Sequence, residues 1–279
     1  MFLFKKILIT VIVFASSFIV NAQRNEVGIF LGTSYYLGDL NPSKQFFLAK
    51  PAGGIIYRYT ISSHWNLKFN GLLGSIQGAD SLSKANVQRN LSFKSSLLEA
   101  SMQLEYNFLP YITGGKGINN ITPYIFTGLA IFHFNPMAEY DGVWYALQPV
   151  GTEGQRTAES TLKPYALTQV SIPFGLGVKY SLGNKICIGA EWAMRKTFTG
   201  YIDDVSGTYD DPTVITAECG TAAAALSNRS KQSSGQKEDD AGLKRGDGKS
   251  DWYSFAGVFI TYRFKINGDK VCPTEHNRK

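Results

Sequence analysis

Past its N-terminal segment, the sequence has no apolar run of about eighteen residues, the length that a membrane-spanning helix needs. It is poor in cysteine and histidine, with three residues of each. Its formal net charge is +6, and no dense run of basic residues accompanies this excess. These absences exclude a helical membrane span in the mature chain and give no reason to expect a nucleic-acid partner.

The N-terminal segment has the pattern of a secretory signal peptide. Two lysines precede an apolar run over residues 7–20, and a small-residue site follows it. We therefore expect a signal peptide over residues 1–22, cleaved between Ala22 and Gln23. The alternative is an uncleaved anchor helix, for which the apolar run is short.

Beyond this segment, the sequence is rich in alternating patterns. Residues 98–108 read LEASMQLEYNF, in which apolar residues occupy every even position while Glu99 and Glu105 share the odd positions. Alternation places the two sets on opposite faces of a strand. The stretch is long enough to cross a bilayer as a tilted strand, which takes about 9–11 residues, with one face toward lipid and the other toward a polar interior.

Similar segments recur along the chain. Eight candidate strands cover residues 27–38, 53–60, 65–76, 91–108, 123–134, 165–181, 186–201 and 252–264.

The lengths of the connections between these strands favour a membrane barrel. The connections at 61–64 and 182–185 are tight, the connection at 109–122 is intermediate, and the long connections are 39–52, 77–90, 135–164 and 202–251. An even strand number with alternating short and long connections is typical of outer-membrane barrels. The sequence thus predicts an all-β fold, an eight-stranded antiparallel up-and-down transmembrane β-barrel over residues 23–265, with short periplasmic turns and long extracellular loops. A periplasmic C-terminal tail over residues 266–279 follows it.

Alternation also predicts which charged residues face the barrel lumen. Buried charges must be paired, and this set carries both signs, so we expect a plugged lumen with no open channel. The predicted lumen charge network comprises Arg58, Lys68, Glu99, Glu105, Lys179, Glu191, Arg195 and Arg263.

Aromatic residues gather at the strand ends next to the predicted periplasmic turns, which is the position of an interfacial aromatic girdle. The alternative explanation is the ordinary preference of aromatic residues for strands. The predicted girdle comprises Tyr57, Tyr59, Trp65, Tyr106, Phe108, Tyr124, Tyr180, Tyr262 and Phe264.

The sequence lacks the patterns of an active site. It has no glycine-rich phosphate loop, no paired catalytic acids and no cysteine–histidine metal spacing. His64, His133 and His276 are far apart, and only His133 is near the predicted outer rim, with no serine beside it. We therefore expect no enzyme activity and no cofactor.

Several stretches resemble the PorG-like outer-membrane proteins of Bacteroidetes. They are YYLGDLNP (35–42), PAGGIIYRY (51–59), LSFKSSLLEASMQLEYNF (91–108), ALQPVGTEGQ (146–155), IPFGLGVKY (172–180), TFTGYIDDVSGTY (197–209) and RGDGKSDWYSFAGV (245–258). The resemblance covers most of the mature chain, with a departure at Gly200, where an acidic residue is expected.

This resemblance implies a barrel component of the type IX (Por) secretion system that associates with a periplasmic ring of a lipoprotein and its partner. The partners to expect are these ring proteins and outer-membrane lipids. The alternative function is a general small outer-membrane barrel, which binds envelope components or passes small solutes and is unrelated to secretion.

Two further sites are weighed from the sequence. Clustered carboxylates at Asp203, Asp204, Asp210 and Asp211 are weak calcium candidates, because their spacing fits no EF-hand and clustered aspartates are more often solvated or capping. Cys187 lies just after a predicted periplasmic turn, and Cys272 lies just beyond the neighbouring last strand. They are a candidate disulfide in an oxidising periplasm, although alternation points Cys187 inward.

Overall fold

The computed structural model describes residues 24–115, 119–158, 160, 162–230 and 240–264. The predicted signal peptide, the tail over 266–279 and Cys272 lie outside these residues. The strands are β1 (Arg24–Leu37), β2 (Lys50–Thr60), β3 (Trp65–Ala79), β4 (Ser92–Asn107), β5 (Ile121–Tyr140), β6 (Val143–Ala146), β7 (Thr168–Leu182), β8 (Ile186–Thr197) and β9 (Trp252–Phe264). The helices are α2 (Asp80–Ser83), α3 (Leu147–Val150), α4 (Pro212–Cys219) and α5 (Thr221–Ser227).

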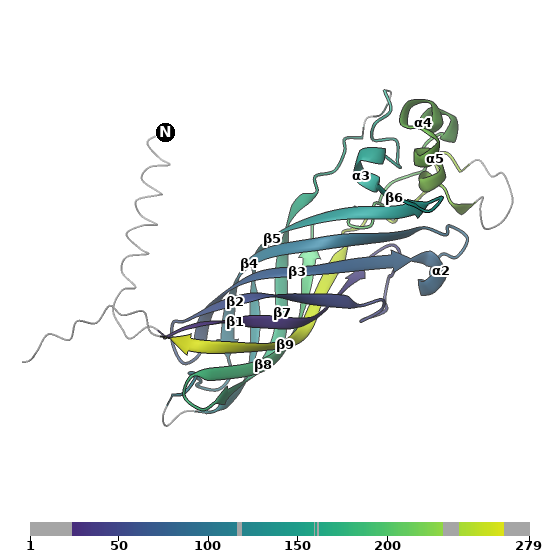
Figure 1. The fold of residues 1–279 in the computed structure, drawn as a ribbon. Helices are drawn as coiled ribbons and strands as arrows, with labels where there is room; N and C mark the ends of the chain where they lie inside the picture. Colours follow the sequence, from purple (N-terminus) through teal and green to yellow (C-terminus); the bar gives the residue numbers. More distant parts are fainter. Residues whose placement is uncertain (1–23, 116–118, 159, 161, 231–239, 265–279) are drawn as a thin grey trace, which may run out of the picture.

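Eight of these strands form a closed antiparallel barrel, as predicted. The sheet runs in the order β4-β3-β2-β1-β9-β8-β7-β5-β6, and β4 also pairs with β5, which closes the ring (Figure 1). Every neighbouring pair is antiparallel, including β1 with β9. Closure leaves no free edge among the eight barrel strands, as a bilayer requires.

The barrel has two unlike ends. At the turn end lie the tight connections 61–64 and 183–185 and the segment 108–120. At the loop end lie the four long connections, with β6 and all four described helices gathered there (Figure 1). Among the described residues, no helix is long and apolar enough to cross a membrane.

One predicted loop is partly strand. The sequence prediction ended the fifth strand at Phe134, but β5 continues to Tyr140 and turns through Asp141 and Gly142 into β6. Both turn residues have positive φ, at 50° and 75°. Pro136 and the polar residues around it hide this extension from a hydrophobic pattern, because prolines are uncommon inside strands.

The outward face of the barrel is apolar and exposed. Leu98, Met102 and Leu104 on β4 are 52%, 46% and 42% exposed, whereas the alternate residues Glu99, Ser101 and Gln103 are buried. The same alternation holds on β1, where Ile29 and Leu31 face outward and Phe30 is 1% exposed. A band of this kind around a closed barrel is the surface that lipid covers.

Two glycines allow β1 and β9 to approach closely. Gly32 and Gly257 lie opposite each other in the antiparallel register. A Cβ on Gly32 would lie 2.2 Å from the carbonyl oxygen of Ala256, and one on Gly257 would lie 2.4 Å from that of Leu31. Only glycine fits such a close approach of two backbones.

Candidate functional site

The turn-side half of the lumen is filled by ion pairs around two central carboxylates. The Arg58 guanidinium donates to Glu26 Oε2 at 2.8 Å and to Glu105 Oε2 at 2.9 Å. Lys179 Nζ lies 2.5 Å from the same Glu105 oxygen, and Lys68 Nζ lies 3.4 Å from the other. Glu105 therefore has three cationic partners, contributed by three different strands.

Glu191 extends this network toward β5. Its Oε2 accepts hydrogen bonds from Lys68 Nζ and from the Tyr124 hydroxyl, both at 2.7 Å. The ring of Phe126 also packs 4.2 Å from Lys68 Nζ, which gives the ammonium a cation–π contact. The three cations and three carboxylates of this network, Arg58, Lys68, Lys179, Glu26, Glu105 and Glu191, are all buried.

A second lumen cluster lies closer to the loop end. Arg195 Nε donates to Glu99 Oε2 at 3.0 Å, and the Tyr253 hydroxyl donates to the same oxygen at 3.0 Å. Aromatic rings pack around it: the Phe132 and Tyr253 centroids are 4.9 Å apart, and Phe255 lies 4.7 Å from the Arg195 guanidinium carbon. Ion pairs and aromatic rings together fill the lumen.

The structure brings together seven of the eight predicted lumen charges. Arg263 lies apart at the turn end, where its guanidinium donates to the carbonyl oxygen of Thr113. Sequence reasoning missed Glu26, because the first strand was expected to begin at Val27. With Glu26 included, the described lumen pairs four cations, Arg58, Lys68, Lys179 and Arg195, with four carboxylates, Glu26, Glu99, Glu105 and Glu191.

The segment after β4 closes the turn end. Tyr111 is 3% exposed, and the Thr113 hydroxyl donates to Glu26 Oε1 inside the barrel. Gly114 has φ +62°, and a Cβ there would lie 2.1 Å from the carbonyl oxygen of Asn184. The backbone therefore folds tightly into the mouth, and we call residues 109–115 the plug.

The structure places one of the nine residues predicted for the girdle inside the lumen. Tyr124 is wrong: it is 1% exposed and hydrogen-bonded to Glu191 inside the lumen. Both faces of β5 carry large apolar residues, so the pattern could not tell which face Tyr124 occupies. The other eight lie on the outward side at the turn end, where Trp65 packs 4.9 Å from Tyr106 and Tyr106 packs 5.7 Å from Phe108.

At the loop end, charged residues from all four long connections form a buried polar layer over the barrel. We call it the cap, and it consists of Asp39, which is half-buried, and the buried residues Asp80, Arg89, Glu153, Asp203, Asp204, Arg245 and Asp251.

The first part of the cap is a carboxylate cluster above Tyr36. The Tyr36 hydroxyl donates to Asp203 and lies 3.1 Å from Asp251 Oδ1. Asp251 Oδ2 accepts from the backbone N–H of Ile202 at 2.9 Å, and Asp39 Oδ1 accepts from that of Asp247 at 2.9 Å. Three separate loop segments thus meet at one tyrosine.

Arg89 ties two further segments to this cluster. Its guanidinium binds both oxygens of Asp80, at 2.7 and 2.8 Å. It also donates to the backbone carbonyl oxygens of Arg245, at 2.6 Å, and Asp39, at 3.0 Å. Arg89 therefore uses its planar fork on one carboxylate and two loop backbones.

Arg245 is the corresponding link on the other side of the cap. Its side chain is buried, with Nη1 3.0 Å from Glu153 Oε1 and Nη2 3.6 Å from Asp204 Oδ2. Glu153 also accepts from the backbone N–H groups of Ser206 and Gly207, at distances of 3.0–3.1 Å. The Asp204 carboxylate accepts from the hydroxyls of Thr152 and of Tyr165, the latter at 2.6 Å.

Burial shifts the acidity of the cap carboxyls. It raises the pKa of Asp39 and that of Asp204 to about 6 each, although Arg245 opposes the shift at Asp204. Burial, together with neighbouring carboxylates, raises the pKa of Asp203 and of Asp251 well above the usual range. The two arginines of the cap offset only part of this cost of burial, because six carboxyls share them.

The structure does not bring the four weak calcium candidates together. Asp203 joins the Tyr36 cluster, Asp204 contacts Arg245, Asp210 lies against Gly154, and Asp211 caps α4 by accepting from the backbone N–H of Thr213. Oxygens of Asp39, Asp203 and Asp251 lie within 4.8 Å of one another, a spacing at which carboxylates could hold a hard cation. Tyr36 already occupies an oxygen of two of them.

Cys187 is buried inside the barrel, as alternation indicated. Cys272 lies outside the described residues, so the disulfide between them stays a prediction.

The DUF6089 family, described as a domain of unknown function, matches residues 5–216. The chain belongs to the DUF6089 family. The matched range of this DUF6089 protein reaches from β1 through β8 into α4, so it includes six of the eight cap residues. Arg245 and Asp251 lie beyond it. A search of curated proteins gave no match.

Three solved barrels are similar in structure. Ail, the attachment invasion locus protein of Yersinia pestis, is 9% identical over 88% of this chain and 100% of its own, with a TM-score of 0.40. Neisserial surface protein A is 9% identical over 88% and 98%, with a TM-score of 0.40. OprG from Pseudomonas aeruginosa is 11% identical over 88% and 97%, with a TM-score of 0.37.

Proposed function

We propose that this DUF6089 protein is a non-enzymatic outer-membrane component of the type IX protein secretion machinery and associates with its periplasmic ring complex. The observation that carries the proposal is the filled lumen. Four ion-paired cations and four carboxylates occupy it, and the plug closes its turn end. A barrel filled in this way acts through its wall and its two ends, which is the role of an assembly component rather than a pore.

The segments that resemble PorG-like proteins also meet in space. Four of them, 35–42, 146–155, 197–209 and 245–258, supply most of the cap and the tyrosine beneath it. The resemblance therefore extends over one three-dimensional cluster, not only over separate loops. This supports placing the chain with the PorG-like proteins.

The proposal places the loop end outside the cell and the turn end in the periplasm. The connections 61–64 and 183–185 offer little surface there, and Tyr111 and Thr113 of the plug are buried in the barrel. The tail over residues 266–279 is then the best candidate for contact with the ring.

Deleting the gene and measuring bulk protein secretion tests this function directly. We expect secretion to fall, and to be restored by the full-length chain. A chain truncated after Lys265 should remain a heat-modifiable barrel but should no longer co-purify with the ring proteins from detergent-solubilised outer membranes. Normal secretion in the deletion strain, with no ring protein in the full-length purification, would instead favour a general small outer-membrane barrel.

A further inference from the structure

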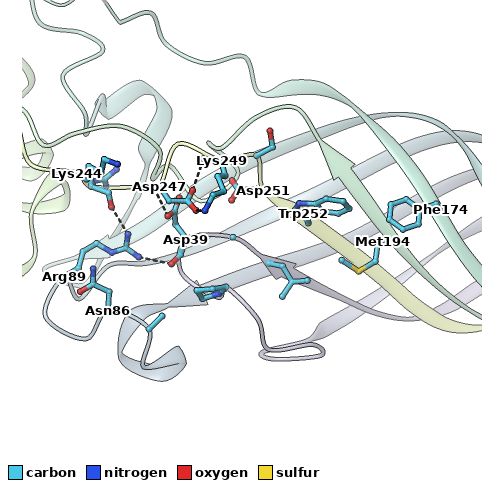
Figure 2. A pocket seen from close by; sticks show the side chains of 17 residues that line it. Asp39, Asn86, Arg89, Phe174, Met194, Lys244, Asp247, Lys249, Asp251 and Trp252 are labelled. Atoms are coloured by element: carbon cyan, nitrogen blue, oxygen red, sulfur yellow. Dashed lines mark hydrogen bonds and ion pairs between the residues drawn. The ribbon is translucent and has the colours of Figure 1, made fainter.

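A cavity of about 830 Å³ opens where the cap meets the outer wall of the barrel. Its lining comes from three loop segments, 38–42, 85–89 and 244–251, from the end of β1, and from the wall strands β7, β8 and β9. Figure 2 shows charged side chains gathered on the loops, while Trp252, Met194 and Phe174 lie along the barrel strands. The volume is within the range of small-molecule sites, about 300–1,000 Å³.

The wall side of the cavity is continuous with the lipid-facing surface. Phe174 is 41% exposed and packs edge-on against Trp252, with ring centroids 6.0 Å apart. Met194 lies beside Phe174 in the antiparallel register. Farther along the same outer wall, Leu176 and Val258 are 54% and 58% exposed. An acyl chain lying on this wall would therefore reach the cavity without crossing a polar barrier.

The rim of the cavity is basic. Lys244 and Lys249 are exposed on the loop, and Lys196 Nζ lies 5.8 Å from the Trp252 ring. Asp247 lies on the same loop and pairs with Lys249 at 2.8 Å. The rim therefore carries an excess of positive charge at the level where a lipid headgroup would lie.

The inner wall is acidic and already occupied. Asp39 and Asp251 accept from the backbone N–H groups of Asp247 and Ile202, while Arg89 and Arg245 are held by cap carboxylates. These acids would repel an anion from the depth of the cavity. A bound headgroup would thus stay at the lysine rim.

We propose that this cavity seats an anionic, phosphate-bearing membrane lipid, with its phosphate between Lys244 and Lys249 and an acyl chain against Trp252, Met194 and Phe174. The basic rim complements the charge of the lipid phosphate, and the apolar wall below it complements the acyl chain of the same molecule. The lipid comes from the leaflet at the loop end of the barrel.

The test is native mass spectrometry of the full-length barrel, purified in detergent and offered phosphatidylglycerol, phosphatidylcholine or inorganic phosphate. We expect one phosphatidylglycerol to be retained, and the variant Lys244→Glu/Lys249→Glu to bind it about tenfold more weakly or worse. The control Lys84→Glu/Lys163→Glu makes the same charge change on exposed loop lysines outside the cavity and should bind like the unmodified protein. Heat modifiability of each variant verifies that its barrel is folded, and Lys244→Gln/Lys249→Gln replaces the glutamate pair if it does not fold.

A second measurement locates the acyl chain. Phosphatidylglycerol with brominated chains should quench tryptophan fluorescence, and Trp252→Phe should remove the part of the quenching that unbrominated phosphatidylglycerol competes away. Equal weakening in the lysine control, equal retention of phosphatidylcholine, or binding of inorganic phosphate that displaces the lipid would each overturn the proposal.

Discussion

The lumen and the cap are both buried and both rich in charge, but they balance that charge differently. In the lumen, four carboxylates meet four cations, and every carboxylate has a cation within 3.0 Å. In the cap, six carboxyls share Arg89 and Arg245. The cap makes up the difference with hydroxyl and backbone donors, such as Tyr36, Thr152 and the N–H groups of Ser206 and Gly207.

Because of this difference, we expect the stability of the lumen to depend little on pH and the stability of the cap to depend on it. A buried carboxylate with a cation stays ionised and holds its partner in place. A buried carboxyl that relies on neutral donors binds protons more tightly, as the raised pKa values of Asp39, Asp203, Asp204 and Asp251 indicate. The lumen should therefore be insensitive to conditions that loosen the cap.

The largest expected effect comes from breaking the lumen network. Arg58→Met leaves Glu26 without a cation and removes one of the three cationic partners of Glu105. Breaking a buried pair by removing one partner costs about 3–5 kcal/mol. We expect the urea concentration at which half of the barrels unfold to fall. The measurement is urea unfolding of the protein in bilayers, with the folded fraction read from its heat-modifiable migration. Lys185→Met, on an exposed lysine at the turn end, is the control, and equal midpoints for the two variants would contradict the prediction.

Arg245→Met should have a comparable local cost, about 3–5 kcal/mol, confined to the cap. The substitution removes the cationic partner of Glu153 and Asp204 but removes no contact between barrel strands. Limited proteolysis should cut the 198–251 connection faster, while the urea midpoint of the barrel stays unchanged. The neighbouring exposed residue provides the control Lys244→Met. A barrel midpoint lowered as far as in Arg58→Met would show that cap and barrel unfold together.

Raising the pH should loosen the cap and spare the barrel. Burial raises the pKa of Asp204 from 3.8 to about 6, so its contribution to stability is full below pH 4 and is lost as the pH rises through 6. A shift of this size corresponds to roughly 3 kcal/mol. Asp203 and Asp251, with pKa values raised well above normal, extend the loss to higher pH. The measurement is the rate of proteolysis of the cap at pH 5 and pH 8, normalised at each pH to the cleavage of an unstructured peptide. Slower cleavage of the cap at pH 8 than at pH 5 would contradict the prediction.

The smallest expected effect is a gain. Asp251→Asn removes one ionisable group from the carboxylate cluster and keeps a side-chain oxygen that can accept from the backbone N–H of Ile202. We expect little change at pH 5 and a stabilisation of about 1 kcal/mol at pH 8, because the asparagine avoids the cost of the buried charge that Asp251 acquires as the pH rises. The readout is the same normalised proteolysis. A variant destabilised at both pH values would mean that Asp251 is ionised and required as an anion.

The sequence by itself determined the barrel. Alternation indicated which face of most strands is polar, so seven lumen charges could be predicted before their partners were known. Connection lengths fixed the strand number and the difference between the two ends. Alternation could not place two residues correctly. Tyr124 lies on a strand with two apolar faces, and Glu26 lies one residue before the expected start of its strand.

Only the tertiary structure decided the cap and the plug. The sequence could not pair Glu153 with Arg245, which lies 92 positions away. It grouped Asp203 with its neighbours in the chain, whereas the fold groups it with Asp39, Asp251 and Tyr36. The physical reason is that strands repeat every two residues, whereas irregular loops have no period. Their contacts are set by which connections barrel closure brings to the same end.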